Sequence, residues 1–200
     1  MTDGRGNPLT VSGKSNDGIN VVGSSFAFTV SAGGTIFFSA IPVSVNDPIK
    51  TGWARLESIG GRLTAAEIFQ YVEDGRIETT AGVLQSQPVQ FATIPADDDD
   101  SQEKFTAYAI ANPSGEAISI KLAVVDENGA VVVDIVTITL GPGQQIARYL
   151  HEDLARLKFR GTMVLRGQAG KTFVAVSLVQ NQKRFTVIPV IPEKATTIPD

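Results

Sequence analysis

Short runs of Val, Ile, Thr and Phe, separated every few residues by Gly, Pro or Asn, dominate this chain and limit what it can fold into. Such runs are typical of strands, because β-branched and aromatic side chains fit a pleated sheet, while Gly, Pro and Asn fit the turns between strands. Examples are "AISIKLAVV" (117–125) and "KTFVAVSLVQ" (171–180). Asx-Gly dipeptides at 17–18, 74–75 and 128–129 are typical of hairpin turns. The pattern predicts an all-β fold of the sandwich class.

A single segment has the periodicity of a helix. In "YLHEDLARL" (149–157), Leu150, Leu154 and Leu157 recur at i, i+4 and i+7, as on one face of a helix. The segment is about two turns long at 3.6 residues per turn. We therefore expect one short helix that connects strands in the second half of the chain.

The chain also matches itself at an offset of about 110 residues, which is a sign of an internal repeat. "TVSAGGTIFFSA" (29–40) aligns with "TLGPGQQIARYL" (139–150), "LTAAEIFQ" (63–70) aligns with "FVAVSLVQ" (173–180), and "FATIPA" (91–96) echoes "FTVIPV" (185–190). This order predicts two tandem immunoglobulin-like β-sandwich modules. We expect module 1 at 1–96, an acidic linker at 97–102, module 2 at 103–192 and a C-terminal tail at 193–200.

The two copies differ in two ways. Module 1 has an insertion at 71–90 that predicts a projecting hairpin or loop, where module 2 has only residues 181–184. Module 2 opens with the apolar strand "FTAYAIAN" (105–112), whereas the N-terminus of module 1 is too polar and glycine-rich to replace it. Because an uncovered sheet edge can pair with a foreign strand, we expect module 1 to accept one.

"FTAYAIANPSGEAISIKLAVVDENGAVV", followed by "LGPGQQIARYLHEDL", "FRGTMVL" and "FTVIPV", resembles a repeat that occurs in tandem in large secreted or surface proteins of bacteria. "TGWARLES" and "FATIP" resemble the end of a preceding copy. The resemblance covers most of the chain and is closest over 103–190. It implies an extracellular or cell-surface array of β-modules without known catalytic activity, and it supplies no site residues.

Composition narrows the possible partners. Hydrophobic residues make up 42% of the chain and charged residues 19%, as in ordinary globular proteins. A net charge of −4 argues against nucleic acid as the main partner, and no apolar run is as long as a membrane span. The absence of cysteine excludes disulfides and thiolate chemistry, but it does not settle the compartment.

The sequence shows no catalytic constellation. His151, the one histidine, lies beside Glu152 and Asp153 in the expected helix, and no serine sits in a nucleophile elbow. "SGKS" (12–15) lacks the glycine that a phosphate-binding loop requires five positions earlier. We therefore expect no enzyme activity and no cofactor.

Four consecutive aspartates, Asp97, Asp98, Asp99 and Asp100, allow three interpretations. The first is a solvated linker. The second is a calcium site that uses Asp98 and Asp100, although the run lacks the alternating spacing and the glycine of typical calcium loops. The third is an electrostatic contact, between modules or between subunits, with the basic residues Arg156, Lys158 and Arg160.

Period-2 alternation suggests which side chains face outwards. By comparison with module 2, we expect Ala54, Leu56, Thr64, Ala66 and Ile68 to face the core of module 1. The candidate contact residues on the opposite face are Trp53, Arg55, Glu57, Glu67, Phe69 and Tyr71.

Two functions fit these features. The first is a non-catalytic structural or adhesion module of a bacterial extracellular or cell-surface assembly, for example a filament, whose partners are copies of itself or neighbouring modules. Strand addition would use an apolar tail with Ile191, Pro192 and Ile198 as its strand-donor residues. The alternative is a carbohydrate-binding module, since exposed aromatic rings beside charged groups suit a glycan.

Overall fold

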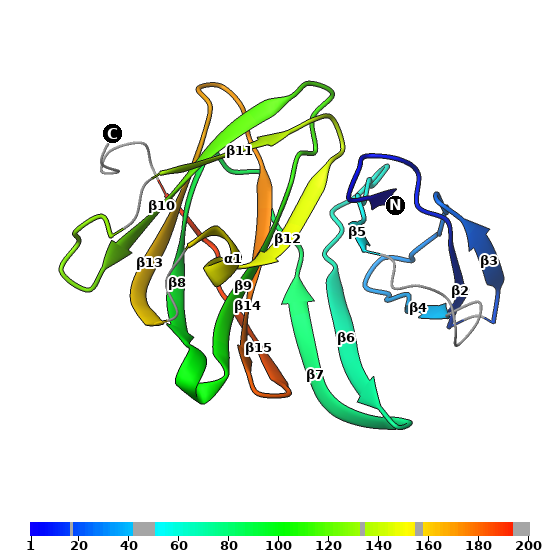
Figure 1. Cartoon of the computed structure of the whole chain (residues 1–200). Coiled ribbons are helices and arrows are strands. Elements are labelled where there is room, and N and C mark those ends of the chain that lie inside the picture. The colour runs from blue at the N-terminus through cyan, green and yellow to red at the C-terminus, as the bar shows by residue number, and fades with distance from the viewer. Residues whose placement is uncertain (17, 42–50, 133–134, 155–157, 194–200) are drawn as a thin grey trace.

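The structure, a computed structural model, describes residues 1–16, 18–41, 51–132, 135–154 and 158–193. It is mostly antiparallel strands with one short helix, which confirms the all-β class (Figure 1). The first part of the chain contains β1 (Thr2–Asp3), β2 (Val11–Ser15), β3 (Asn20–Gly23), β4 (Phe38–Ile41), β5 (Gly52–Trp53), β6 (Ala66–Glu73) and β7 (Arg76–Leu84). The second part contains β8 (Phe91–Asp99), the 3-10 turn η1 (Asp100–Gln102), β9 (Lys104–Ala111), β10 (Ile118–Asp126), β11 (Val136–Leu140), β12 (Gln145–Tyr149), α1 (Leu150–Asp153), β13 (Lys158–Gly167), β14 (Val174–Asn181), β15 (Arg184–Ile188) and β16 (Ile191–Pro192).

The second part forms one nine-stranded sheet that folds over at the β8–β9 turn. One half has the order β11-β10-β13-β8, with β16 paired to β8, and the other has the order β9-β14-β15, with β12 paired to β9. Strands β8 and β9 pair only through Asp99 and Lys104, so beyond that turn they separate and the two halves face each other. The sheet thereby encloses a core.

This core holds the largest fully buried side chains of the described chain. Ile94, Leu122 and Met163 come from the β8 half, and Ile110 and Phe173 come from the β9 half. Leu150, the first residue of α1, is also fully buried, so the predicted short helix closes one end of the core. Since a fully buried side chain of this size contributes about 1.5–3 kcal/mol, the core accounts for most of the stability of the second part.

The described residues of the first part form three small sheets, which are the pair β1-β5, the set β3-β2-β4 and the β6–β7 hairpin. The hairpin turns at Asp74-Gly75, where both residues have positive φ (49° and 75°), as the sequence predicts for a two-residue turn. The insertion predicted at 71–90 therefore contains the end of a hairpin that spans 66–84, and its last residues, 85–90, follow β7.

The first of several contacts that join the parts lies at the turn between β11 and β12. The Trp53 indole donates a hydrogen bond to the Gly143 carbonyl (2.8 Å), in the turn between β11 and β12. Beside it, Gly6 has φ +89° and approaches so closely that a Cβ would lie 2.6 Å from the Pro142 carbonyl oxygen. Any residue with a Cβ at this position would require the backbone to move.

The second contact is between β7 and β15. The backbone N–H of Phe185 donates to the Thr79 hydroxyl (3.4 Å), and the Phe185 ring meets the Tyr71 ring edge-on at 6.1 Å. At the hairpin end, Lys183 binds Glu73 at 2.5 Å. The hairpin thus lies beside β15 without a ladder of backbone hydrogen bonds (Figure 1).

The predicted domain boundaries need correction. "FATIP", expected to close module 1, begins β8, and β8 pairs with β13 along nine residues, from Phe91 to Asp99. The predicted acidic linker at 97–102 is therefore a strand end and a tight turn inside one sheet. The two-module repeat is not confirmed, because the first part forms separate small sheets while the second part forms one large sheet.

Candidate functional site

The four aspartates lie where β8 ends and the chain turns into β9. Even-numbered residues of β8 point into the core, so Asp98 follows Ala96 on the inward row and is only 3% exposed. Asp97 and Asp99 flank it on the other face, and Asp100 begins the 3-10 turn. Alternation along a strand therefore sends neighbouring carboxylates in opposite directions.

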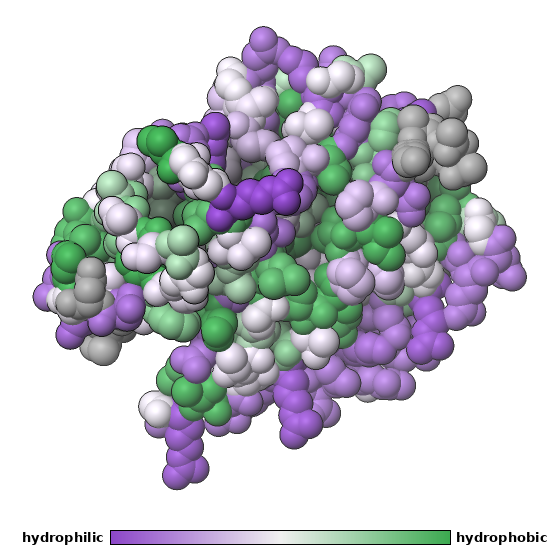
Figure 2. Space-filling model, turned by 180° about the vertical axis from the view of Figure 1, so that it is seen from behind, coloured by the Kyte–Doolittle hydropathy of each residue, from purple (hydrophilic) through white to green (hydrophobic). Residues whose placement is uncertain are grey.

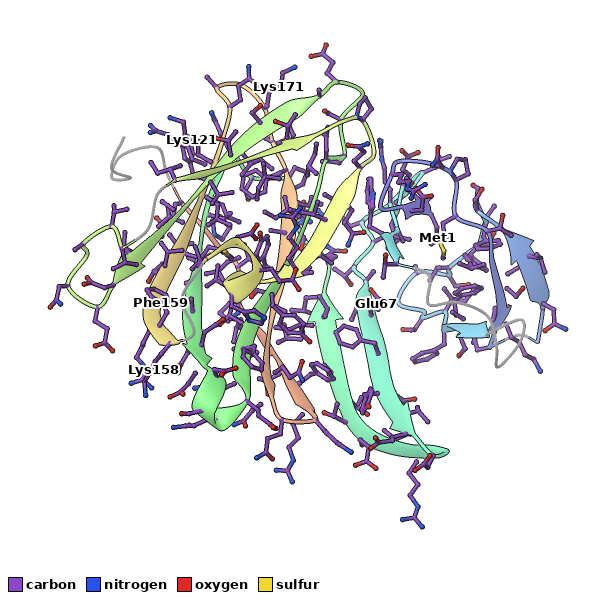
Figure 3. The ribbon with its side chains drawn as sticks, viewed as in Figure 1. Met1, Glu67, Lys121, Lys158, Phe159 and Lys171 are labelled. Carbon is purple, nitrogen blue, oxygen red and sulfur yellow. The ribbon has the colours of Figure 1, made fainter. Side chains whose placement is uncertain are left out.

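Asp97 and Asp99 are paired with basic residues. Asp97 binds both Lys104 and Arg160, the latter at 3.3 Å, and Asp99 binds Lys158 at 2.9 Å. Figure 3 shows Lys158 at the end of β13, directed away from the sheet. Burial raises the pKa of Asp97, but Lys104 and Arg160 outweigh it and hold that pKa below its usual value. Hydrogen bonds from Ser101, and then Lys158, lower the pKa of Asp99.

The expected electrostatic contact therefore exists within one sheet, between the neighbouring strands β8 and β13. Lys158 and Arg160 stand opposite Asp99 and Asp97 in the strand register. Arg156, the third predicted basic partner, lies outside the described residues. These pairs explain how so acidic a run can occupy a strand.

Asp98 has a different environment. Its Oδ1 accepts the backbone N–H of Thr106 (2.7 Å), while its Oδ2 lies 3.7 Å from His151 Nδ1, and neither of these last two atoms has a hydrogen-bond partner. The imidazole stacks on the Tyr149 ring (5.4 Å) and meets Phe105 at 4.8 Å. Burial raises the pKa of Asp98 above its usual value, against the opposing effects of Thr106 and His151.

This geometry does not favour a calcium site. Asp98 points into the core, whereas Asp100 is exposed on the turn. Calcium requires six to eight converging oxygens, and the described residues contain no group of three or more metal-ligating side chains.

A second buried polar network lies beside α1 and was not predicted. The Tyr108 hydroxyl donates to Asp153, and Arg148 binds the other oxygen of this carboxylate at 2.7 Å. Burial and the Asp153 charge both raise the pKa of Tyr108. Arg148 and Asp153 are five residues apart in sequence, but Tyr108 comes from β9, so no local pattern indicates the network.

The six predicted contact residues do not form one platform. Trp53 is half-buried against Gly143, Arg55 pairs with Glu57 at 2.7 Å on the surface, and Tyr71 packs on Phe185. Glu67 is exposed and Phe69 half-buried on the hairpin, with Glu67 labelled in Figure 3. Trp53 and the three hairpin residues belong to different sheets, so the single face expected to carry them does not form.

The predicted core face of module 1 is also wrong. Leu56 is 59% exposed and Ile68 66% exposed, and Ala54, Thr64 and Ala66 are exposed as well. On the hairpin the buried side chains are Ala81 and Val83, which lie across from Phe69 and Glu67. The hairpin buries the opposite face because β15 and Phe185 lie on that side.

Exposed apolar side chains concentrate in the first part of the chain. Thirteen of the sixteen large apolar side chains that are exposed in the described residues lie between 19 and 84: Ile19, Val22, Phe28, Val30, Phe37, Leu56, Ile59, Leu63, Ile68, Tyr71, Val72, Ile77 and Leu84. These side chains are spread over the small sheets of the first part and the segments between them, and each leaves apolar area in water. Sequence hydrophobicity alone had suggested a core here.

The predicted strand-donor tail pairs with its own chain. Ile191 and Pro192 form β16 against Thr93 and Ala92 of β8, and the Glu193 N–H donates to the Phe91 carbonyl (3.0 Å). Ile198 lies outside the described residues.

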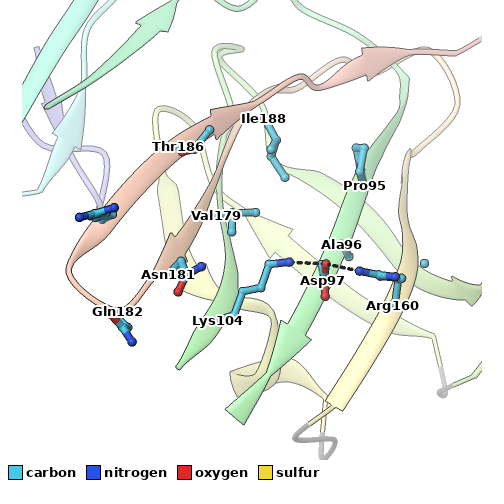
Figure 4. A pocket seen from close by; sticks show the side chains of 12 residues that line it. Pro95, Ala96, Asp97, Lys104, Arg160, Val179, Asn181, Gln182, Thr186 and Ile188 are labelled. Carbon is cyan, nitrogen blue, oxygen red and sulfur yellow. Dashed lines mark hydrogen bonds and ion pairs between the residues drawn. The ribbon is translucent and has the colours of Figure 1, made fainter. Parts of the chain in front are cut away.

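A groove of about 810 Å³ opens where β8 faces the β14–β15 hairpin. Pro95, Ala96, Val179, Thr186 and Ile188 line one end of the groove, and charged and amide side chains line the other (Figure 4). The polar residues are Asp97, Lys104, Arg160, Asn181, Gln182 and Arg184. Figure 2 shows the molecule from behind Figure 1, with hydrophobic residues near the middle of this face and hydrophilic residues along its lower edge.

Fold and site together define an all-β protein with exposed apolar side chains in its first part and a groove in its second. No family model matches the chain, and no curated protein does. A solved structure titled "Crystal Structure of Thermotoga maritima 1070" is similar over 55% of this chain and 97% of its own, with 10% identity and a TM-score of 0.38. Among the described residues, no helix has the length and apolar character needed to cross a membrane.

Proposed function

We propose that this chain is a non-catalytic structural module of a bacterial extracellular or cell-surface assembly, and that it associates with copies of itself through its first part. The observation that supports this most is the exposed apolar surface between residues 19 and 84. In an isolated chain this surface would face water at a free-energy cost of about 25 cal/mol per Å². A partner that covers it removes that cost.

The β6–β7 hairpin is the centre of the proposed contact. A two-stranded hairpin is marginally stable by itself, and the edge of β6 is unpaired among the described residues. Its solvent face carries Ile68, Val72, Ile77 and Leu84, each more than half exposed. Strand addition at β6, with burial of these side chains, would extend the hairpin and complete the predicted tandem immunoglobulin-like organisation.

Analytical ultracentrifugation across a range of concentrations tests the proposal. Ile68→Asp combined with Leu84→Asp should shift the protein toward monomer by at least tenfold in apparent dissociation constant. Val131→Asp is the matched control, because Val131 is 43% exposed but lies in the second part. The proposal is wrong if the wild type is monomeric at every concentration. It is also wrong if Val131→Asp raises the apparent dissociation constant as much as the double substitution does.

A further inference from the structure

The groove between β8 and the β14–β15 hairpin is large enough to hold a small ligand. Its volume of about 810 Å³ is within the range of small-molecule sites. It lies where β8 and β9 separate beyond the Asp99–Lys104 pair. One wall is β8, and the other is the β14–β15 hairpin, which continues the sheet from β9. Val179 and Ile188, which are half-buried, thus reach the groove from the edge of the core.

The two ends of the groove differ in chemistry. Figure 4 shows Ile188, Thr186, Pro95 and Val179 toward one end, with Lys104, Asp97 and Arg160 at the other. An occupant that satisfies both ends has an apolar body and a polar head.

The polar end carries an excess of positive charge. Asp97 is shared by Lys104 and Arg160, so a single carboxylate faces two cations. Arg160 also approaches Glu127, but only at 4.0 Å and on the exposed surface. Arg184 adds a third cation at the rim, and no acid among the described residues pairs with it. This balance is opposite in sign to the net charge of −4 on the whole chain.

We propose that this groove binds a monoanionic amphiphile, of the class of a medium-chain aliphatic carboxylate. The carboxylate accepts hydrogen bonds from Arg160 and Lys104, beside Asp97, and the aliphatic chain lies against Val179, Ile188 and Pro95. Charge-assisted hydrogen bonds to the head group and removal of the tail from water both contribute to affinity. This site is independent of the self-association proposed above.

Octanoate below its micelle concentration is the probe, with binding measured by isothermal titration calorimetry and by ¹⁵N chemical-shift changes. Octanol tests whether the charge is needed, and butyrate tests whether the tail is needed. We expect octanoate to bind at least tenfold more tightly than either compound, with amide shifts at 96, 97, 104 and 179–188. Binding of octanol as tight as that of octanoate, or shifts confined to residues 19–84, would refute the proposal.

Two substitutions locate the head and the tail. Arg160→Gln removes one cation while Lys104 still pairs with Asp97, and it should weaken octanoate binding about tenfold without affecting octanol. Ile188→Asn should weaken both. Arg160 is a better residue to substitute than Arg184, because Arg184 also borders a smaller hollow, of about 310 Å³, together with Glu78 and Glu103.

Arg55→Gln is the matched control, because Arg55 is an exposed arginine paired with Glu57 outside the groove. The Arg55→Gln variant should bind octanoate as tightly as the wild type does. Equal weakening by Arg55→Gln and Arg160→Gln would overturn the assignment of Arg160 to the head group. Circular dichroism confirms that each variant is folded. Ultracentrifugation of the same samples reports self-association separately, so failure of either proposal leaves the other testable.

Discussion

Replacing Asn112 with aspartate should destabilise the second part by several kcal/mol, although the two side chains have nearly the same shape. Asn112 follows β9 in the "AIANP" segment, and its side chain is fully buried. Its Nδ2 donates to the carbonyls of Glu116 (2.7 Å), Leu140 (3.1 Å) and Gly141 (2.9 Å), while its Oδ1 accepts the N–H (3.0 Å) and hydroxyl (2.7 Å) of Ser114. One amide thus ties the end of β9 to the β9–β10 turn and to the end of β11.

The magnitude follows from these contacts. Each hydrogen bond contributes about 1 kcal/mol net, and the two hydrogens of Nδ2 are shared among the three carbonyls, so their loss costs about 2 kcal/mol. The introduced carboxylate would also point at three carbonyl oxygens in a buried site, which raises the cost to about 4–5 kcal/mol at neutral pH. Burial raises the pKa of such a carboxyl. Its protonated form, which can donate one bond, is favoured at low pH, so the penalty shrinks as pH falls through the raised pKa and grows as pH rises.

Urea denaturation followed by far-UV circular dichroism measures the effect. Ser114→Ala is the matched control, since it removes a hydroxyl that bonds Asn112 Oδ1 and the Glu116 carbonyl at the edge of the site, and it should cost about 1 kcal/mol. If Asn112→Asp costs less than Ser114→Ala, or if its penalty does not change with pH, the reasoning is refuted.

Other predictions address the remaining parts of the structure. Asp98→Asn should be more stable than the wild type at neutral pH and lose that advantage in acid, because the raised pKa of Asp98 means that folding favours its protonated form; urea titrations at several pH values measure this. Trp53→Phe should keep the packing but lose the bond to Gly143, at a cost of about 1 kcal/mol, and should speed proteolysis within residues 1–64 while sparing the second part. Gly6→Ala should also speed proteolysis within residues 1–64, because the new Cβ would meet the Pro142 carbonyl. An unchanged cleavage rate would contradict this contact.

Local patterns in the sequence predicted the elements that depend on neighbouring residues. The turn at Asp74-Gly75 requires two positive φ angles, which Asp and Gly tolerate. The leucine spacing predicted a helix of about two turns at 149–157, and α1 occupies only Leu150–Asp153 of it, while Leu157 lies outside the described residues. Such features are set within a few residues. For that reason the all-β class could be predicted without knowledge of tertiary contacts.

The packing of the hairpin and the environment of the aspartates depend on residues distant in sequence, which local patterns do not reveal. Alternation showed correctly that Glu67, Phe69 and Tyr71 share a face, but it could not show that this face packs toward β15. The aspartate run predicted a hydrated linker because four carboxylates repel one another. In the folded chain Lys104, Lys158 and Arg160 offset that repulsion, and two of these lie about 60 residues away.

The two parts of the chain also differ in how they protect their strand edges, and this difference indicates which edge should accept a strand in the proposed assembly. On β8, odd-numbered residues direct their backbone groups away from β13, as the bond between Phe91 and Glu193 shows. Beyond Thr93, the next such positions are Pro95, which has no N–H, and Asp97, whose N–H is already bound by the Thr106 hydroxyl (2.9 Å). The edge of β8 therefore offers no free donor to an incoming strand. The edge of β6 contains no proline and no comparable bond among the described residues, so strand addition in an assembly should occur at the hairpin and not at β8.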